Sequence, residues 1–477
     1  MTDLRRIAID PVSRVEGHGK VTLLLDDAGH VHEARLHIVE FRGFEAFIVG
    51  RPYWEVPVVV QRLCGICPVS HNLCASKALD AVVGGVPPPS AVKLRRLMHA
   101  GQMLQSHALH FFHLASPDLL FGFDSDVAKR NLMGLVESHP EIAKQGVMLR
   151  KFGQQVLEAV YGKRIHGTGA IPGGVNKHLA LADRDTFLSQ LPQVKTWALE
   201  AVALARQLTE SNMARHVGFG AVPSNLLSLV AADGTLDLYD GGLRAKDAEG
   251  RVLFDGLDAS TYRQLIQEEV RPWSYMKFPY LSAMGPEAGW YKVGPLARLQ
   301  VCDRLSTPLA EAARREFIAS SPSTIHAPLA SHWARLIELL HSAEEIELLL
   351  HDEDLLHGDL VSTGQRQREG VGVIEAPRGT LIHHYEVNED DLVTRCNLIV
   401  STTNNNQAMN EAIRSVAHQY LDGHSVTEGL LNHLEVAVRA FDPCLSCATH
   451  AMGQMPLEVT LLDAAGTVVD VMRRDAS

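Results

Sequence analysis

The sequence predicts a mainly α fold with small β-sheets, an α+β class. Apolar residues recur at the three- and four-residue spacing of amphipathic helices over several long stretches. Shorter apolar runs on either side of an Asp/Ala/Gly turn occur near both ends of the chain, which is typical of β-hairpins. The 477 residues would suit two or three domains, but no repeat array and no low-complexity linker divides them.

The chain is expected to begin with a β-hairpin region, residues 1–60, in which VTLLLDDAGHV at 21–31 forms two strands around a turn. A helical body, residues 61–450, follows this region. Residues 220–260 are rich in Gly and Asp and are interpreted as a loop or a small β insertion in the body. A C-terminal extension, residues 451–477, completes the chain.

Four helices of the body can be placed from their apolar spacing. They are expected at 91–115, from Trp333 to Ile346, from Met409 to Tyr420 and from Val426 to about Arg439. The polar run from Thr402 to Asn406 precedes the third helix and offers N-cap side chains. The C-terminal extension repeats the hairpin pattern as VTLLDAAGTVV at 459–469, which shared turn chemistry explains better than duplication does.

The composition excludes several classes of protein. Hydrophobic residues make up 46% and charged residues 21%, a balance that favours a packed core over disorder. The net charge is −12 and no basic run of five residues occurs, which argues against a nucleic-acid or anionic membrane surface. No apolar stretch has the length of a signal peptide or of a transmembrane helix. Seven cysteines, an odd number, suggest reduced thiols or metal ligands, so a cytoplasmic chain is expected.

Two Cys-x-x-Cys pairs lie far apart, Cys64 with Cys67 near the start and Cys444 with Cys447 near the end. Each pair presents two thiolates from one tight turn, and two such pairs make a four-sulfur site for a soft metal. A structural zinc knuckle usually has its pairs about 15–20 residues apart. Joining both ends of a large chain is better suited to a site buried in the middle of the protein. The spacing alone leaves zinc and a redox metal equally favoured.

The residues that flank both pairs resemble the two cysteine signatures of the nickel–iron hydrogenase large subunit. The signatures read RxCGxCxxxH and DPCxxCxxH, and the chain has RLCGICPVSH at 62–71 and DPCLSCATH at 442–450. The resemblance covers nearly the whole chain, through the segments RVEGHGK, FRGFE, EAPRG and TTNNN. The length and the phrases DPCLSCATHAMGQMPL, WSYMKFPYL and IPGGVN are similar to the cytoplasmic NAD-reducing, or bidirectional, branch of that family.

The resemblance implies a central helical bundle with the metal site between the N- and C-terminal segments. Nickel would be held by all four thiolates, and Cys67 and Cys447 would also bridge to an iron that carries one CO and two cyanides. Thiolates are soft, strongly donating ligands, which suits nickel. A magnesium ion would be bound by Glu45, the Leu398 carbonyl and His450. A histidine is an atypical ligand for this hard cation, so the resemblance alone supports that set.

Heterolytic cleavage of hydrogen needs a base beside the metal, and Glu16 in RVEGHGK matches the family's proton-relay glutamate. It would receive the proton from a terminal thiolate, that of Cys444. Arg378 matches the family's arginine above the open metal position. Its guanidinium can hydrogen-bond a cyanide but is not an easy base, because its pKa exceeds about 12. Asp118 and Asp442 are interpreted as its carboxylate partners. Without the motifs, a surface glutamate and a helix-terminal aspartate would be the ordinary interpretations.

Thr402 aligns with the family residue whose hydroxyl donates to a cyanide. Ser401 could be that donor instead, and both could simply cap the following helix. His71 is expected to hydrogen-bond a bridging thiolate and so tune its donor strength. Family large subunits are made as precursors, which a dedicated endopeptidase cuts after the last histidine of DPCxxCxxH. The cleavage site would therefore lie between His450 and Ala451, and the C-terminal extension would be a removable tail.

Other residues that can bind metals or nucleotides are interpreted without a function. Hydrogen-bonded packing is favoured over zinc binding for four histidines on one predicted helix: His99, His107, His110 and His113. Three cysteines outside the pairs are interpreted as small buried hydrophobes: Cys74, Cys302 and Cys396. No complete phosphate loop and no GxGxxG fingerprint occurs, so no FMN or NAD site is expected on this chain.

The implied function is that of the catalytic subunit of an NAD-linked hydrogenase, which reversibly cleaves H2 to protons and electrons. Electrons would pass through a small iron–sulfur subunit to flavin/NAD diaphorase subunits, because the chain holds no cysteine set for clusters of its own. The endopeptidase and nickel-insertion factors would be maturation partners, whereas no nucleic acid and no membrane are expected. Alternatives are a hydrogen sensor, a hydrogenase with an NADP or deazaflavin acceptor, a cysteine-held zinc scaffold, and a quinone-oxidoreductase relative that kept the fold.

Overall fold

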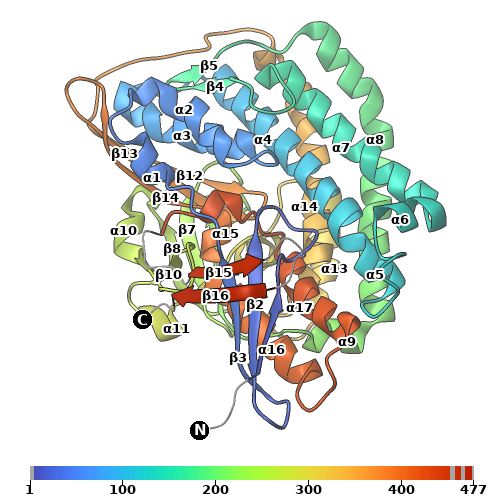
Figure 1. Cartoon of the computed structure of the whole chain (residues 1–477). Helices are drawn as coiled ribbons and strands as arrows, with labels where there is room; N and C mark the ends of the chain where they lie inside the picture. The colour runs from blue at the N-terminus through green and yellow to red at the C-terminus, as the bar shows by residue number, and fades with distance from the viewer. Residues whose placement is uncertain (1–4, 452–456, 463–467, 475–477) are drawn as a thin grey trace.

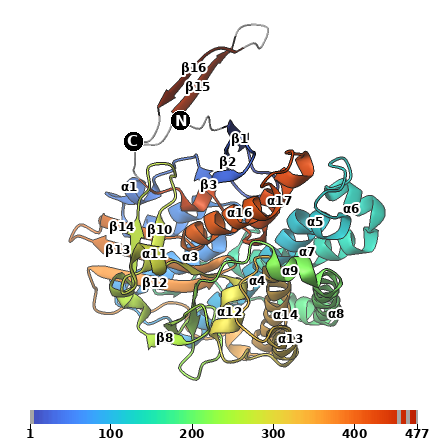
Figure 2. The ribbon, with the colours of Figure 1, turned by 90° about the horizontal axis from the view of Figure 1, so that it is seen from below.

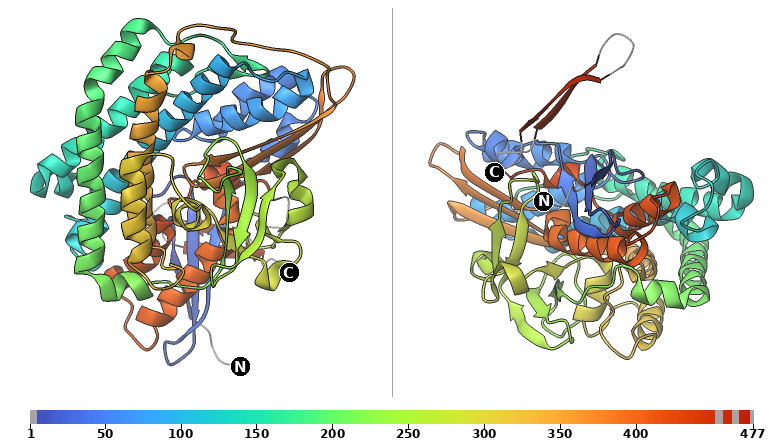
Figure 3. Two further views of the ribbon diagram at one scale, coloured as in Figure 1. Left: turned by 180° about the vertical axis from the view of Figure 1, so that it is seen from behind. Right: turned by 60° about the horizontal axis from the view of Figure 1, so that its bottom comes forward.

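Long helices form one side of the molecule and small sheets the other. The computed structural model describes residues 5–451, 457–462 and 468–474 (Figure 1). The long helices pack on one another: α4 Pro89–Leu109, α7 Pro140–Tyr161, α8 Leu181–Ser211 and α14 Ala330–Leu350. Seen from behind, α8 and α14 run side by side (Figure 3). The predicted class, mainly helical with small sheets, is confirmed.

Both helices predicted for this bundle are confirmed. The stretch predicted at 91–115 is α4 together with a π-helical continuation, His110–Ala115. The stretch from Trp333 to Ile346 lies inside α14. Their apolar stripes are buried, as Leu97 and Leu340 illustrate, so burial against neighbouring helices is what stabilises them.

The N-terminal sheet is a three-stranded antiparallel meander of β1 Arg5–Ile9, β2 Gly19–Leu25 and β3 Val31–Ile38. The predicted hairpin is β2 and β3, and the structure adds β1 along its edge. In the turn, the Asp26 carboxylate accepts hydrogen bonds from the backbone N–H groups of Ala28 and His30 at 2.9 Å. This Asx-type bonding is the reason that the turn forms where the sequence places aspartate.

A central sheet of β12 Glu369–Ala376, β13 Gly379–Val387 and β14 Val393–Ile399 packs against helix α3, Pro68–Val83. Ala376 pairs with Gly379, so β12 and β13 are joined by a tight turn of two residues, Pro377 and Arg378. Gly379 has φ +131°, and a Cβ there would lie 2.2 Å from the Val293 side chain. Only glycine fits, and the turn places Arg378 at the tip of the hairpin.

The Gly- and Asp-rich insertion at 220–260 is expected from its sequence to be a loop or a small β insertion. It forms β strands. Strands β6 Asn225–Val230, β7 Gly242–Lys246 and β8 Val252–Leu257 are antiparallel, and β11 Tyr291–Lys292 adds parallel to β6. The β11–β6 pairing joins residues far apart in the chain, so local pattern could not predict it.

Near the C-terminal end, α15 Ser401–Asn404 leads into α16 Asn406–Tyr420 and then α17 Glu428–Ala440. The two helices predicted here are confirmed, but the predicted N-cap is wrong, because no side chain caps α16. The polar run is itself helical and buried, and its amides are used in tertiary contacts. Asn404 donates to the Thr380 carbonyl at 2.8 Å, for example, and Asn405 accepts from the Val293 N–H at 2.9 Å.

The C-terminal extension contains the predicted hairpin, β15 Leu457–Leu462 paired with β16 Val468–Arg474. It stands away from the rest of the molecule, as Figure 2 shows. The boundaries predicted at residues 60 and 450 stay predictions, since one hydrophobic core runs from Val12 to Ala448. Within the described residues, no helix combines the length and apolarity needed to cross a membrane.

The remaining elements are short and mostly connect these layers. They are α1 Phe44–Ile48, α2 Val56–Val59, α5 Ser116–Phe121, α6 Leu132–Ser138, β4 Ala170–Ile171, β5 Gly174–Val175, α9 Met213–Gly218, α10 Tyr262–Leu265, β9 Ile266–Glu269, β10 Phe278–Leu281, α11 Gly285–Ala288, α12 Pro295–Val301 and α13 Pro308–Ala319.

Candidate metal centre

The two cysteine pairs meet in the interior. Cys64 and Cys67 directly precede α3, and Cys444 and Cys447 follow α17 in a tight turn. The Sγ atoms all lie within 4.8 Å of one another. The separations are 2.9 Å between Cys444 and Cys447, 3.1 Å between Cys64 and Cys444, 3.8 Å between Cys67 and Cys447, and 4.0 Å between Cys67 and Cys444. The structure therefore brings together all four sulfurs that the sequence singled out.

These four sulfurs fit a soft metal ion. Thiolate–metal bonds of about 2.3 Å in a tetrahedron place sulfurs about 3.8 Å apart, close to the longer of the separations. All four thiols are free and buried. Burial disfavours a thiolate, but hydrogen bonds from the neighbouring thiols Cys444, Cys447 and Cys67 outweigh it and hold the pKa of Cys64 well below its usual value. The cluster already favours one negative sulfur, the form in which cysteine binds metals.

The N-terminal loop brings a carboxylate to the sulfurs. Glu16 forms a parallel bridge with Cys444, and its carbonyl accepts from the Leu445 N–H at 3.0 Å. Gly17 permits this approach, because a Cβ there would lie 2.6 Å from the Ser446 nitrogen. Glu16 Oε2 lies 3.0 Å from Cys444 Sγ and 3.1 Å from the Ser446 nitrogen. Burial, and then the negative charge of Cys64, raise the pKa of Glu16, so it can hold a proton from the thiol beside it.

A small cavity of about 10 Å³ adjoins the sulfurs, close to the space that one water molecule needs. Apolar side chains and hydrogen-bond donors line it together. The apolar group comprises Ala376, Pro377, Leu381 and Val400, and the polar group comprises Ser70, His71, Arg378, Ser401 and Thr402. The walls thus offer apolar contact and hydrogen-bond donors side by side, next to Cys67, Cys444 and Cys447.

Arg378 is fixed in this wall by Asp442. Its Nε donates to the Asp442 carbonyl at 2.6 Å, and its Nη2 donates to the Asp442 carboxylate at 3.0 Å. Burial would lower the pKa of Arg378, but the charges of Asp442 and Cys444 outweigh it and raise the pKa, so the guanidinium stays charged. The predicted partnership with Asp442 is present in the structure.

The predicted partnership of Asp118 with Arg378 is wrong. Asp118 accepts from Arg14 at 2.5 Å and from Arg439 at 2.9 Å, and it also accepts from the Asn432 amide at 3.2 Å. It lies in the first turn of α5, where it ties the N-terminal loop to α17 instead of reaching the cavity.

The hydroxyl hydrogen of Ser401 is already used in a hydrogen bond, whereas that of Thr402 is not. Ser401 Oγ donates its hydrogen to the Gly379 carbonyl at 2.7 Å. Thr402 Oγ1 accepts from the Cys444 N–H at 2.9 Å, which leaves its own hydrogen available on the cavity side. Of the two alternatives, the geometry favours Thr402 as the donor.

His71 lines the cavity but does not form the predicted bond to a thiolate. Its Nδ1 pairs with His383 Nε2 at 3.1 Å, and His383 Nδ1 pairs with the Tyr385 hydroxyl at 2.6 Å. Burial lowers the pKa of His71 to about 4, so the imidazole is neutral. His71 is therefore fixed by a buried chain of rings rather than by sulfur.

Two of the residues predicted to bind magnesium, Glu45 and Leu398, meet at the outer edge of β14, and His450 follows the second cysteine turn. The Glu45 carboxylate accepts from the Leu398 N–H at 2.8 Å and from Lys277 at 3.0 and 3.1 Å. His450 Nε2 donates to the Cys447 carbonyl at 2.8 Å, and its buried Nδ1 has no partner. Burial lowers the pKa of His450 to about 3, so it is the neutral ring that a metal ligand must be.

Sequence reasoning missed Lys277, which contacts Glu45, together with Glu268, the second carboxylate on that ammonium at 3.4 Å. Lys277 stands in the segment WSYMKFPYL, whose resemblance to the family gives its lysine no role. A lysine inside an apolar and aromatic stretch is the signal that could have found it.

The residues interpreted without a function mostly pack as expected. Three histidines of α4 and its continuation bond to separate groups: His99 to the Leu238 and Glu375 carbonyls, His107 to Glu338, and His110 to the Arg439 carbonyl. Cys74 and Cys302 are buried, whereas Cys396 is only partly so. Burial raises the pKa of Cys302 to about 11 and that of Cys74 further, so both thiols are inert.

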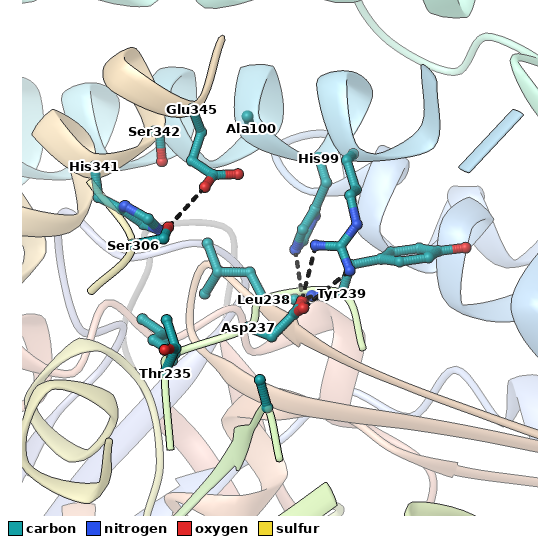
Figure 4. Close-up of a pocket in the computed structure, with 13 residues that line it drawn as sticks. His99, Ala100, Thr235, Asp237, Leu238, Tyr239, Ser306, His341, Ser342 and Glu345 are labelled. Atoms are coloured by element: carbon teal, nitrogen blue, oxygen red, sulfur yellow. Dashed lines mark hydrogen bonds and ion pairs between the residues drawn. The ribbon is translucent and has the colours of Figure 1, made fainter. Parts of the chain in front are cut away.

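A larger pocket of about 220 Å³ lies elsewhere, between α4, α14 and the loop that follows β6 (Figure 4). Its polar groups already satisfy one another. Arg96 is paired with Asp237, and Ser306 donates to Glu345 at 3.0 Å. It holds no cysteine, so it is separate from the candidate centre.

One further group of metal-binding side chains occurs among the described residues, at Glu369, His384 and Glu386. Both ring nitrogens of His384 are already paired, with the Tyr262 hydroxyl and Glu369. Arg263 forms ion pairs with the carboxylates of both Glu369 and Glu386. Arg395 forms a further ion pair with Glu386, so the negative charges are balanced without a metal cation. This group is an ion-pair cluster at the sheet edge.

Comparison with known proteins is consistent with this geometry. A family described as nickel-dependent hydrogenase matches residues 42–126 and 237–450, and one described as HoxL-like matches residues 6–41. The chain is 48% identical to the NAD-reducing hydrogenase HoxS subunit beta of Cupriavidus necator, over 98% of this chain and 100% of that one. It is 40% identical to a subunit of the F420-non-reducing hydrogenase vhc of Methanococcus voltae, over 95% and 96% of the two chains.

Solved structures are similar as well. A crystal structure of an NAD+-reducing [NiFe]-hydrogenase in the H2-reduced state superposes with a TM-score of 0.93 at 62% identity, over 94% of this chain and 100% of that one. The Ni-Fe-Se hydrogenase of D. vulgaris Hildenborough, at 24% identity and a TM-score of 0.76 over 94% and 100% of the chains, shares the fold.

Proposed function

The chain belongs to the nickel-dependent hydrogenase family, and on that premise we propose that it is the catalytic subunit of an NAD-linked hydrogenase. The reaction is the reversible, heterolytic cleavage of H2 into protons and electrons. The observation that carries the proposal is the convergence of four buried cysteine sulfurs from the two ends of the chain, with a carboxylate 3.0 Å from one of them. The NAD-reducing relative that the chain matches over its full length supports NAD as the acceptor.

Cys64, Cys67, Cys444 and Cys447 would hold nickel, and Cys67 and Cys447 would also hold an iron with one CO and two cyanides. The cavity beside the sulfurs has walls suited to such ligands, because its apolar side chains suit CO and its donors suit cyanide nitrogen. When bound, the metal pair supplies the polarisation that splits hydrogen into a hydride and a proton. A zinc scaffold would need neither the cavity nor the carboxylate.

The proton would travel along residues of this chain. The thiolate of Cys444 accepts it first, and Glu16 Oε2 then takes it across the 3.0 Å contact. Burial makes this carboxylate more basic than an exposed one, which favours transfer from sulfur. Glu16 also accepts from the Ser446 N–H, so its oxygen is held in place for the transfer.

Arg378 and Thr402 would hold the ligands of the iron. Arg378 is charged, buried and oriented by Asp442, so it presents a fixed positive donor to the cavity. Thr402 is oriented by the Cys444 N–H, and its free hydrogen can donate to a cyanide. Both side chains are oriented by hydrogen bonds within the protein before any ligand is present, which is the basis of electrostatic preorganisation.

We further propose that Glu45, the Leu398 carbonyl and His450 bind magnesium. The Leu398 N–H bonds to Glu45 across the outer edge of β14, so the carbonyl of the same residue faces the same side. The unpaired Nδ1 of His450 supplies a nitrogen that nothing in the protein uses. Lys277 would then be the charge that holds Glu45 in position.

The electrons need a partner, and we propose that an iron–sulfur subunit docks on an apolar patch of the N-terminal region. Its members are all more than 40% exposed: Val39, Phe41, Phe47, Val49, Trp54 and Val58. The segment that carries it contacts both cysteine turns. Arg42 donates to the Leu63 carbonyl, and the Gly43 N–H donates to the Thr449 carbonyl. Exposed apolar side chains on a segment that contacts both cysteine turns suit an electron-transfer partner, which a flavin/NAD diaphorase pair would follow.

The family match ends at His450, which supports removal of the C-terminal extension by an endopeptidase after nickel-insertion factors have loaded the site. We also place the chain in the cytoplasm, where NAD is available and free thiols stay reduced.

Metal analysis and infrared spectroscopy of the purified assembly test the proposal. We expect about one nickel per chain, three bands from one CO and two cyanides, and hydrogen-dependent reduction of NAD. Zinc in place of nickel, or the absence of the bands, would contradict it. Protein that contains nickel and shows the infrared bands but turns over slowly would point to the hydrogen-sensor alternative. Reduction of NADP or a deazaflavin, without reduction of NAD, would show that the enzyme uses that other electron acceptor.

A further inference from the structure

Ser70 is the least explained side chain in the wall of the metal cavity. It lies in the first turn of α3, three residues after Cys67, and it is 1% exposed. Its Oγ has no hydrogen-bond partner. Buried hydroxyls almost always have a partner, so an orphaned one that lines a cavity points to a ligand in that cavity.

The local structure removes the bond that a helical serine usually makes. A serine in a helix bonds to the carbonyl four residues before it, which here belongs to Ile66. That carbonyl already accepts from the side-chain amides of Gln102 and Gln105, both at 2.9 Å. The two glutamines of α4 therefore leave the Ser70 hydroxyl free to turn toward the cavity. The cysteine sulfurs are not its partners either, since none lies within hydrogen-bonding reach.

We propose that Ser70 donates its hydrogen to one of the iron-bound cyanides, as a donor additional to Arg378 and Thr402. The inference rests on the proposed function, because it needs the iron and its ligands. Cyanide nitrogen is anionic and a far stronger acceptor than CO, so a hydroxyl in this cavity selects it. Ser401, the other serine of the wall, has already donated its hydrogen to the Gly379 carbonyl.

The consequence is electronic. A hydrogen bond to cyanide nitrogen withdraws electron density from the iron and so weakens back-donation to CO. Ser70 would thus raise the CO stretching frequency and help to set the difference between the two cyanides. The hydrogen bond would also oppose loss of the cyanide, because without that ligand the buried Ser70 hydroxyl has no partner.

Infrared spectra of the purified assembly carrying Ser70→Ala test the inference. We expect the CO band to move to lower wavenumber and the separation of the two cyanide bands to change, with nickel and iron content retained. Ser76→Ala is the matched control. It removes another buried, unpartnered hydroxyl from the same helix, but its side chain is not in the cavity wall, so all three bands should stay in place.

The possible outcomes separate the two proposals. Wild-type protein without CO and cyanide bands would overturn the proposed function itself. Wild-type bands that are identical in Ser70→Ala would overturn only the role of Ser70. A parallel shift of all three bands, with the cyanide separation unchanged, would place the hydroxyl on a sulfur and would also overturn it.

Discussion

Glu16 shows how one side chain depends on a backbone contact between the two ends of the chain. Its carbonyl accepts from the Leu445 N–H, and its carboxylate is left 3.0 Å from Cys444 Sγ. Glu16→Gln keeps the shape but cannot accept the proton. We expect hydrogen oxidation to fall by about 10²–10⁴-fold, the usual contribution of a positioned acid or base. Hydrogen-dependent NAD reduction of the purified assembly measures it.

The control for this variant is Glu33→Gln, at a partly exposed position of β3 where the carboxylate pairs with Arg35. It should leave turnover unchanged, and both variants should keep nickel and the infrared bands. Turnover of Glu16→Gln within twofold of wild type would show that the proton leaves by another route.

Lys292 is buried with two backbone carbonyls as its partners, of Val222 at 2.7 Å and His326 at 3.0 Å. Burial lowers its pKa from 10.5 to about 7. Between these values the unfolded chain binds more protons than the folded one, so the free energy of unfolding rises with pH across that window. Below pH 7 both states are protonated, and the cost of the buried charge is felt in full.

Lys292→Met should therefore lose this pH dependence. From pH 7.5 to pH 9.5, we expect wild type to gain about 2–3 kcal/mol relative to the variant, at about 1.4 kcal/mol per pH unit. Urea unfolding of both proteins across that range measures the difference. Parallel pH profiles for the two proteins would mean that Lys292 keeps its charge when folded.

Residues inside the signatures could be predicted from the sequence, and residues whose role depends on long-range packing could not. The motifs predict Glu16 and Arg378 as site residues; Glu16 lies beside the Cys444 sulfur and Arg378 lies in the cavity wall. Asp118 was misassigned because nothing local reveals that Arg14 and Arg439 surround it. His71 lines the cavity, but the predicted bond to a thiolate is absent, and the bond that it makes instead depends on His383 in a strand more than 300 residues away.

At the scale of elements, a buried ion-pair group fastens three segments together. Asp118 of α5 pairs with Arg14 of the N-terminal loop and with Arg439 of α17. Arg439 in turn pairs with Glu435, one turn earlier on α17. The loop that carries Glu16 is thus anchored to α5 and, through Asp118, to α17.

Asp118→Asn would leave buried guanidinium groups without their shared carboxylate. We expect the free energy of unfolding to fall by about 3–5 kcal/mol, the usual effect of breaking a buried pair. Chemical unfolding of the purified subunit measures it. Because Asp118 does not contact Arg378, the infrared bands of protein that still loads metal should match wild type, whereas shifted bands would restore the interpretation that it acts at the cavity.

Elements with a strong local period were predictable, and elements made by distant pairing were not. The apolar stripes of α4 and α14 predict both helices from the sequence, because the residues that each helix buries recur at helical spacing. The polar run before α16 read as a cap, yet its asparagines are buried and bond to other segments. The same residue types serve both purposes, so only the tertiary structure decides between them.

At the scale of the whole molecule, the apolar patch of the N-terminal region gives a test of assembly. Phe47→Glu with Trp54→Glu places two charges on side chains that are 51% and 53% exposed. We expect co-purification of the iron–sulfur subunit to fall at least tenfold, because charges are excluded from interface cores. Exchange of H2 with deuterons, which needs only heterolysis, should continue while NAD reduction falls.

The control for the patch is Val86→Glu, at a side chain that is 84% exposed and lies outside the patch. It should co-purify with its partner as wild type does. Retained binding by the double variant would move the docking surface elsewhere on the molecule.

The proposed cleavage site is protected by the fold. His450 is 4% exposed and Ala451 1%, and the Ala451 N–H donates to the Tyr275 carbonyl at 2.9 Å. We expect thermolysin at low concentration to make no cut at the bond between these residues in the purified precursor. The dedicated endopeptidase should give a terminus at His450. Mass spectrometry of both products decides, and a thermolysin product that ends at His450 would show that the bond is open.

The meeting of the two cysteine turns has a consequence for biosynthesis. Cys67 and Cys444 lie 377 positions apart, so a ribosome has to translate most of the described residues between the first half of the ligand set and the second. A truncated or stalled product can offer only two sulfurs, and it cannot be charged with nickel in the way that a finished polypeptide can. Cofactor loading therefore reports that synthesis has passed the second cysteine pair.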